Sequence, residues 1–166
     1  AERFGAGGVA LGFSAWFYNG TSTVNVGLID AEHTRDTDGY RFSFSSYLND
    51  AGQVTGQSNR YGTGGTSLGQ SVYFYDGAST FNIGFVDAEH TRDSDGYRSS
   101  GVLQSPNASG DVIGYASRYV GSDLLGRSAW LYDGTETINI GLTDAEHTRD
   151  TNGWRDSTAS FLNDAG

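Results

Sequence analysis

The sequence predicts an all-β fold made of tandem repeats, each with four antiparallel strands. One motif recurs three times at a spacing of 57 residues. Glycine supplies 25 of the 166 residues while proline occurs once, a composition typical of many tight turns. Apolar and polar residues alternate with a period of two in several segments, and we find no helical periodicity.

Two segments define the repeat. The aromatic segment reads SAWFYNG at 14–20, SVYFYDG at 71–77 and SAWLYDG at 128–134. The acidic segment reads DAEHTRDTDGYR at 30–41, DAEHTRDSDGYR at 87–98 and DAEHTRDTNGWR at 144–155. We therefore expect one repeat domain over residues 1–166, with a partial repeat at 1–13, repeats at 14–70 and 71–127, and a partial repeat at 128–166.

Within one repeat, strands are expected at 13–18, 24–28, 40–48 and 54–61. The first is apolar on both faces, as in a strand that is covered on both sides, and the Asn-Gly that follows it favours a hairpin. The second alternates strictly between apolar and small polar residues. Four strands per repeat are typical of a β-propeller blade, which is the fold we expect, and a β-trefoil is the alternative.

The chain begins and stops inside a repeat, because Arg3-Phe4-Gly5 matches Arg60-Tyr61-Gly62 and residues 162–166 match 48–52. We expect an excerpt of an array, or a unit whose ends complete one another. In the second case, the strand near Arg3–Tyr18 pairs with the strand around Trp154–Leu162 of the same or another chain. Pairing between chains would give a homo-oligomeric ring or a filament.

Composition excludes several classes of function. The net charge is −10, with ten arginines and no lysine, so nucleic acid is not an expected partner. No cysteine is present for disulfides or thiolate metal sites, and no apolar run reaches the length of a membrane span. Asn19 and Asn107 lie in glycosylation sequons, a pattern that is common by chance.

The segments LNDAGQVTGQS (48–58), LGQSVYFYDG (68–77) and NIGF (82–85) resemble the bacterial extracellular repeats of the HAF family. The resemblance extends over essentially the whole chain. It departs at the family's His-Ala-Phe triplet, where this chain has Ser-Ala-Trp or Ser-Val-Tyr, and each acidic loop lengthens the unit. The resemblance implies a secreted or cell-surface bacterial protein that is propeller-like, and it implies no catalytic residues.

The acidic loop is interpreted as a junction between neighbouring repeats. Glu32 and His33 are sequence neighbours, so on an extended segment they would point apart, and a catalytic set would not be repeated in every unit. We therefore expect no enzyme. The residues expected to hydrogen-bond across to the next repeat are Glu32, His33, Arg35, Glu89, His90, Arg92, Glu146, His147 and Arg149.

Calcium is the sharper alternative for this loop, because alternating acidic residues before a glycine supply oxygen ligands. The candidate ligands are Asp36, Asp38, Asp93, Asp95, Asp150 and Asn152. A complete EF-hand pattern is missing. Zinc would require His33, His90 and His147 to converge from three repeats, which the sequence does not favour.

Binding of glycans is the remaining alternative. Aromatic rings in exposed loops could stack on sugars, and the candidates are Tyr40, Tyr97 and Trp154. The function that the sequence favours is nevertheless a non-catalytic extracellular structural or adhesion scaffold that assembles from tandem β repeats, with a lectin-like carbohydrate-binding module as the alternative.

Overall fold

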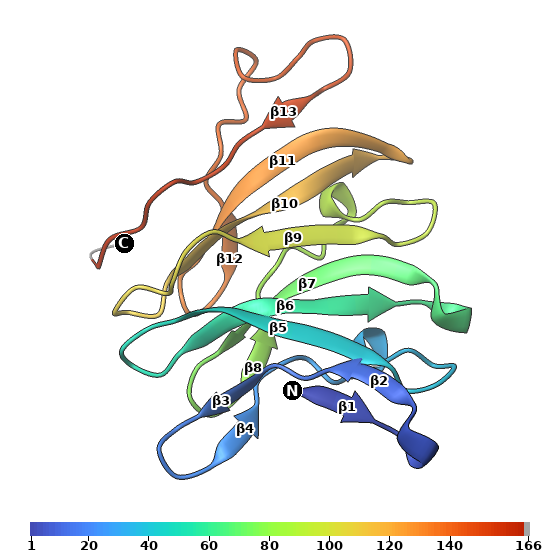
Figure 1. Ribbon diagram of the computed structural model, residues 1–166. Helices are drawn as coiled ribbons and strands as arrows, with labels where there is room; N and C mark the ends of the chain where they lie inside the picture. The colour runs from blue at the N-terminus through green and yellow to red at the C-terminus, as the bar shows by residue number, and fades with distance from the viewer. Residues whose placement is uncertain (165–166) are drawn as a thin grey trace.

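The computed structural model describes residues 1–164 and shows an all-β protein, which confirms the predicted class (Figure 1). The strands are β1 (Glu2–Phe4), β2 (Ala10–Phe13), β3 (Trp16–Tyr18), β4 (Thr23–Asn25), β5 (Arg41–Leu48), β6 (Val54–Tyr61), β7 (Ser67–Tyr75), β8 (Thr80–Asn82), β9 (Arg98–Val102), β10 (Val112–Val120), β11 (Asp123–Tyr132), β12 (Thr137–Asn139) and β13 (Arg155–Asp156). Short 3-10 turns occur at η1 (Ala6–Gly8), η2 (Ala31–His33), η3 (Thr63–Gly65) and η4 (Ala88–His90). β5 and β6 match the strands expected at 40–48 and 54–61, whereas the strand expected at 13–18 is divided between β2 and β3 and the one expected at 24–28 is the shorter β4.

A single eleven-stranded sheet runs through the repeats in the order β1-β2-β5-β6-β7-β9-β10-β11-β12, with β8 also paired to β7 and β13 to β11. The pairs β2–β5, β7–β9 and β11–β13 are parallel, and β3 and β4 form a separate hairpin. The sheet is mixed and open. Separate four-stranded antiparallel blades, a closed propeller and a closed trefoil are therefore not shown by residues 1–164.

The sheet continues from one repeat to the next because each long strand pairs with strands on both sides of a repeat boundary. The first part of β7 pairs with β9 at Gly69–Arg98, and its second part pairs with β8 at Tyr73–Asn82. The first part of β7 therefore extends the sheet to β9, while its second part forms a hairpin with β8. A blade would instead end its sheet within the repeat.

One glycine per repeat permits the close parallel pairing of these two strands. Gly69 has φ +83°, and a Cβ at this position would lie 1.8 Å from the carbonyl oxygen of Arg98. Gly12 and Gly126 occupy the same place opposite Arg41 and Arg155. Only glycine adopts this backbone conformation while leaving room for the parallel strand.

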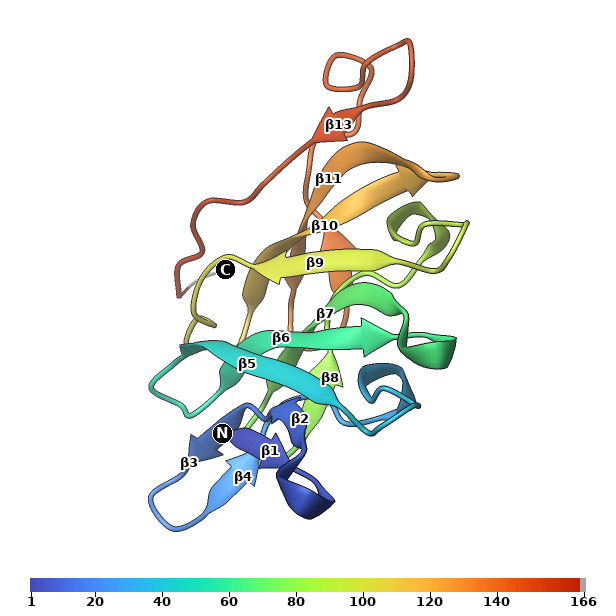
Figure 2. The same ribbon diagram turned by 45° about the vertical axis from the view of Figure 1, so that its right-hand side comes forward.

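The two ends of the sheet lie far apart. β1 is the first strand of the path and β13 pairs at its other end, as Figures 1 and 2 show from two directions. The strands near the two termini therefore do not complete one another within this chain. Of the two pairings expected from the sequence, the one inside a single chain is wrong.

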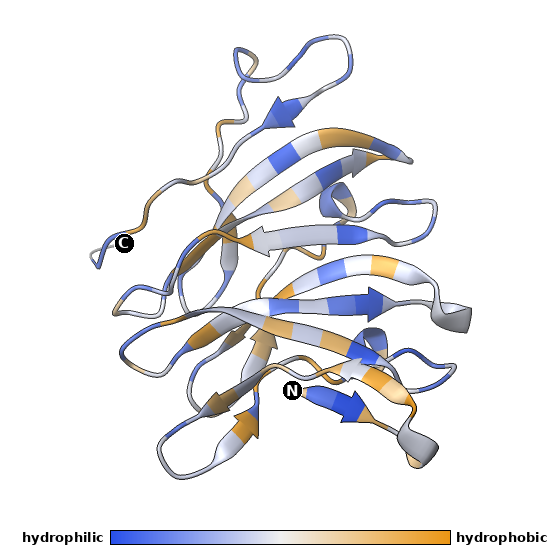
Figure 3. Cartoon of the chain, in the orientation of Figure 1, coloured by the Kyte–Doolittle hydropathy of each residue, from blue (hydrophilic) through white to orange (hydrophobic). Residues whose placement is uncertain are grey.

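The core lies between consecutive repeats. Ala15, Val26, Leu28 and Val54 of one repeat pack with Tyr73 and Tyr75 of the next. The second cluster repeats this arrangement with Val72, Phe74, Ile83, Val112, Ala116 and Trp130. Hydrophobic residues concentrate on the strands, while the loops that extend beyond them are largely hydrophilic (Figure 3). Each repeat thus buries its apolar surface against a neighbour.

In residues 1–164 the structure has no helix whose length and apolar character would suit a membrane crossing.

Candidate functional site

The acidic loop of the first repeat is organised around Asp30. Its side chain accepts a hydrogen bond from the backbone N–H of His33 at 3.2 Å and so caps the turn η2. The same Oδ1 atom lies 2.7 Å from Nδ1 of His33. Burial raises the pKa of Asp30, but its hydrogen bonds and charge interaction with His33 outweigh this and lower the pKa below the usual value.

His33 connects this loop to the next repeat. Its side chain is 2 % exposed, and its Nε2 lies 2.9 Å from Oγ of Ser71 on β7. An ionised carboxylate only accepts hydrogen bonds, so Nδ1 donates to Asp30. In the neutral imidazole Nε2 then accepts from the hydroxyl of Ser71. His90, Asp87 and Ser128 repeat this arrangement with 2.7 and 2.9 Å separations.

The order Asp–His–Ser is also that of a hydrolase triad, but the surroundings differ. Ser71 is 4 % exposed and Ser128 is 3 % exposed. The hollow beside this loop is lined by residues such as Glu32, Tyr61 and Leu68 and does not include Ser71. A substrate carbonyl therefore has no access to the Ser71 hydroxyl, and the contacts tie two repeats together.

Glu32 makes the second connection. Its Oε1 accepts from Nε and Nη2 of Arg60 at 3.0 and 2.5 Å, and also from Nη2 of Arg98. Burial raises the pKa of Glu32, but Arg60 and Arg98 outweigh this and lower it below its usual value. One carboxylate thus forms ion pairs with two arginines on different strands.

Arg60 is 3 % exposed and links further parts of the junction. Its Nη1 donates to the carbonyl oxygens of Leu68 at 2.7 Å and Gly96 at 3.0 Å. The next junction is equivalent, because Glu89 accepts from Arg118 at 2.7 Å and from Arg155 at 2.6 Å.

The predicted junction residues thus behave in three ways. Glu32, His33, Glu89 and His90 contact the next repeat as expected, the two glutamates through Arg98 and Arg155. The guanidinium groups of Arg35 and Arg92 instead pair with Asp38 and Asp95 of their own loops. Arg149 lies over the ring of Trp154.

Sequence reasoning missed the receiving partners, which are Arg60, Ser71, Arg98, Arg118, Ser128 and Arg155. The sequence did contain an indication of the serine partners. Ser14, Ser71 and Ser128 recur at the start of the otherwise aromatic segment, where a buried hydroxyl needs a partner.

The third loop carries the same residues, and the described chain ends before a repeat that could receive them. Asp144 still holds Nδ1 of His147 at 2.8 Å, but the His147 side chain is 44 % exposed. Glu146 has no hydrogen bond within residues 1–164. Ligand atoms of these three residues lie within 4.8 Å of one another, which makes them the one group in the described chain with the composition of a metal site.

The residues predicted to bind calcium lie in the exposed part of the loops. The Arg35 fork and the backbone N–H of Tyr40 lower the pKa of Asp38 to about 2, and Asp95 is held in the same way at about 2. Asp36 accepts from the backbone N–H of Gly64 at 3.1 Å. A calcium ion at Asp38 would have to displace Arg35, because both carboxylate oxygens receive that guanidinium.

Asn152 of the third loop accepts from the backbone N–H of Trp154 at 3.1 Å, while Asp93 of the second loop and Asp150 of the third are exposed. Zinc bound by three converging histidines is not supported, because His33 and His90 lie in separate junctions with different serine partners.

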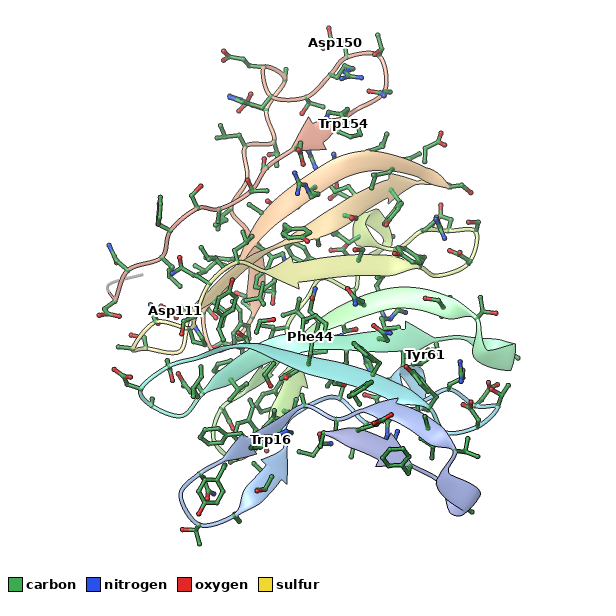
Figure 4. All side chains as sticks on the ribbon, in the orientation of Figure 1. Trp16, Phe44, Tyr61, Asp111, Asp150 and Trp154 are labelled. Carbon is green, nitrogen blue, oxygen red and sulfur yellow. The ribbon has the colours of Figure 1, made fainter. Side chains whose placement is uncertain are left out.

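The aromatic loop residues already have partners on one face. Arg35 lies 4.5 Å from the ring centroid of Tyr40, and Arg92 lies 4.6 Å from that of Tyr97. Trp154 sits under Arg149 at 5.8 Å, on the loop that projects from the end of the molecule (Figure 4). A sugar could stack only on the other face of each ring.

A second set of contacts joins the repeats at the opposite ends of the strands. Asn49 donates from Nδ2 to the carbonyl oxygen of Asn107, and Asn107 donates to that of Asn163, both at 3.0 Å. Asn107 is 6 % exposed, so its amide is committed to this ladder and is poorly placed for glycosylation. The exposed Asn19 instead closes a hairpin turn.

Comparisons with protein-family models, with curated proteins and with solved structures gave no match for this chain. The functional argument therefore rests on the geometry of the junctions.

Proposed function

We propose that this chain is a non-catalytic structural scaffold in which the acidic loop of each repeat fastens the next repeat. The observation that carries the proposal is the repetition of one contact set, with Glu32 and Glu89 each receiving two arginines. Identical contacts in successive junctions serve the same local purpose in each of them.

The chemistry of these side chains supports a structural role. Both ring nitrogens of His33 are engaged, and the carboxylate of Glu32 is neutralised by Arg60 and Arg98. A general base or a nucleophile has to reach a substrate. In these junctions the groups reach only one another.

We place this scaffold outside a bacterial cell, in an architectural or adhesive role, because its repeats resemble the HAF repeats. The charge of −10 keeps such a chain soluble. Antibody labelling of intact source cells, compared with permeabilised ones, tests this placement. Labelling that requires permeabilisation contradicts it.

One substitution made in three repeats tests the scaffold. Glu32→Gln and Glu89→Gln each remove the charge that faces two arginines, whereas Glu146→Gln changes a side chain with no partner in residues 1–164. We expect the internal substitutions to lower the free energy of unfolding by about 1–2 kcal/mol, because a buried arginine loses its counter-charge while the partly exposed carboxylate is already screened by solvent. The matched change at Glu146 should leave it within about 0.5 kcal/mol of the original.

Chemical denaturation at a low protein concentration measures all three. Equal stability of the three variants contradicts the proposal, because the internal carboxylates would then be free for another task.

A further inference from the structure

The two ends of the sheet carry the two halves of one junction. At the N-terminal end, Arg3, Ser14 and Arg41 occupy the positions held in the first internal junction by Arg60, Ser71 and Arg98. At the C-terminal end, Glu146 and His147 occupy the positions of Glu32 and His33. Inside the chain these residue types bind one another, while at the two ends of residues 1–164 each set lacks the other.

The N-terminal set lacks a carboxylate partner for its arginines. Arg3 donates to the carbonyl oxygens of Leu11 and Gly39, as Arg60 does to Leu68 and Gly96, but no carboxylate faces it. Arg41 forms no side-chain hydrogen bond with a carboxylate in the described chain, whereas Nη2 of its counterpart Arg98 donates to Glu32. Burial and the neighbouring positive charge of Arg3 lower the pKa of Arg41. An acceptor with negative charge is therefore needed between Arg3 and Arg41.

The C-terminal set is already arranged to supply it. Asp144 fixes the ring of His147 through Nδ1 at 2.8 Å, as Asp30 fixes His33, and leaves Nε2 directed outward. The side chain is 44 % exposed in His147 and only 2 % exposed in His33. The loop has the conformation of an occupied junction, so docking costs little ordering entropy.

Apolar surface at the two ends is complementary as well. Trp16 is 52 % exposed, although its counterparts Tyr73 and Trp130 are fully buried at 0 %. Trp16 belongs to an open groove at the N-terminal end whose walls also include Phe13, Phe42 and Phe44. Figure 4 shows Trp16 and Trp154 at opposite ends of the array.

At the C-terminal end Ile140 is 46 % exposed and Leu142 is 57 % exposed, whereas Ile83, the counterpart of Ile140, is 2 % exposed against Trp130. Each end therefore presents one half of the apolar contact and one half of the ion pairs that form inside the chain.

We infer that a second copy of this chain docks head to tail, with the Asp144–His147 loop of one copy entering the N-terminal surface of the next. Glu146 accepts from Arg3 of the partner subunit and Arg41 of the partner subunit, and Nε2 of His147 meets Ser14 of the partner subunit. Ile140 and Leu142 cover Trp16 of the partner subunit. The contact is heterologous, and because the internal array is open, its repetition gives a filament. This inference rests on the proposed function, since it reuses the internal junction between chains.

The experiment measures the mass of residues 1–166 over a concentration series by sedimentation. The expected result is growth from 17.7 kDa to species of increasing mass without a fixed endpoint. His147→Ala, at an exposed position that folding does not depend on, should raise the dissociation constant by about tenfold or more. Glu146→Arg and Arg41→Glu should each abolish growth, and Asp50→Arg, an exposed acidic residue in the β5–β6 turn, should not.

An equimolar mixture of Glu146→Arg and Arg41→Glu tests directly whether these two residues meet between copies. In the mixture, each contact between unlike copies either keeps Glu146 and Arg41 or has these two charges exchanged, so growth should return with the two variants in alternation. A chain that carries both Trp130→Phe and Trp154→Phe reports on Trp16, whose quenching by iodide should fall as mass rises.

A mass of 17.7 kDa at every concentration overturns the inference and leaves these surfaces to other repeats. A mass that stops at a dimer, or growth that survives both His147→Ala and Glu146→Arg, also overturns it. None of these three results contradicts the proposed scaffold, which is contradicted if Glu32→Gln and Glu89→Gln are as stable as Glu146→Gln.

Discussion

Nε2 of His33 lies 2.9 Å from the hydroxyl oxygen of Ser71, a residue 38 positions further along the chain. The same separation in sequence and in space joins His90 to Ser128. In each case the imidazole bridges an acidic loop and a strand of the following repeat. A hydrogen bond between side chains so far apart in sequence forms only when the repeats are docked, so it reports on the junction.

Removal of the Ser71 hydroxyl should weaken the first junction. Ser71→Ala leaves the buried Nε2 of His33 without a partner, and we expect the free energy of unfolding to fall by about 1–2 kcal/mol. Ser14→Ala is the matched control, because Ser14 has the same place in the repeat but no side-chain hydrogen bond in residues 1–164. Denaturant titration of the two variants compares them, and equal midpoints would contradict a role for the His33–Ser71 bond.

The buried triad should also be chemically silent. A fluorophosphonate probe labels serines that are activated by histidine and open to solvent. Because Ser71 is 4 % exposed and Ser128 is 3 % exposed, we expect no labelling of the folded chain after overnight incubation. Mass spectrometry of the intact protein is the readout, with a serine hydrolase as the positive control. Stoichiometric labelling at Ser71 would refute the structural interpretation of this triad.

The crossing of β7 and β9 should tolerate nothing larger than glycine. Gly69→Ala places a methyl group 1.8 Å from the carbonyl oxygen of Arg98, so we expect a loss of stability of about 4 kcal/mol or more. Gly64→Ala is the matched control, since Gly64 also has a positive φ but an added Cβ meets nothing within 4 Å. Its cost should be only the backbone term of about 1–2 kcal/mol.

Thermal and chemical unfolding of these two variants separates the effect of the close approach from that of the backbone conformation. Similar losses at both positions would mean that the strands at Gly69 can move apart.

The protein should lose stability in acid through its junction carboxylates. Burial raises the pKa of Glu32, but Arg60 and Arg98 outweigh burial, so the folded pKa lies below the usual 4.5. A lowered folded pKa means that the unfolded chain binds the proton first, and stability is complete above pH 4.5 and declines as pH falls through the folded pKa.

Measurement of the unfolding free energy from pH 7 down to about pH 2 tests this expectation, since the window follows the lowered carboxylate values. Glu32→Gln should flatten part of the decline, because its side chain no longer titrates. A variant that loses stability with the same pH slope as the original chain would show that Glu32 is not one of the groups responsible.

Much of this architecture was accessible from sequence. The period of two located the strands, and the spacing of the acidic segment identified the loop as a junction. The sharing of β7 between β8 and β9 was not accessible, because it depends on the φ of Gly69, and a Leu-Gly pair reads equally well as the end of a strand. Partner choice was inaccessible for a related reason. Glu32 was expected to bind across the junction, but which arginines receive it depends on strand register.

For Arg35 the prediction of a contact with the neighbouring repeat was wrong. Its side chain was assigned to the neighbouring repeat, yet Asp38 lies three residues away in a tight turn and captures the guanidinium first. Local pairs form at a lower entropic cost than distant ones, which a count of charged residues does not reveal.

His33 and His90 each bind a serine of the unit that follows, and Ser71 and Ser128 are each bound from the unit before. Duplication of one such stretch of the gene therefore inserts a segment that fits both of its new neighbours, and no residue elsewhere has to change. The number of copies would then set how far the protein extends. Natural alleles should accordingly differ by whole repeats rather than by fragments of them.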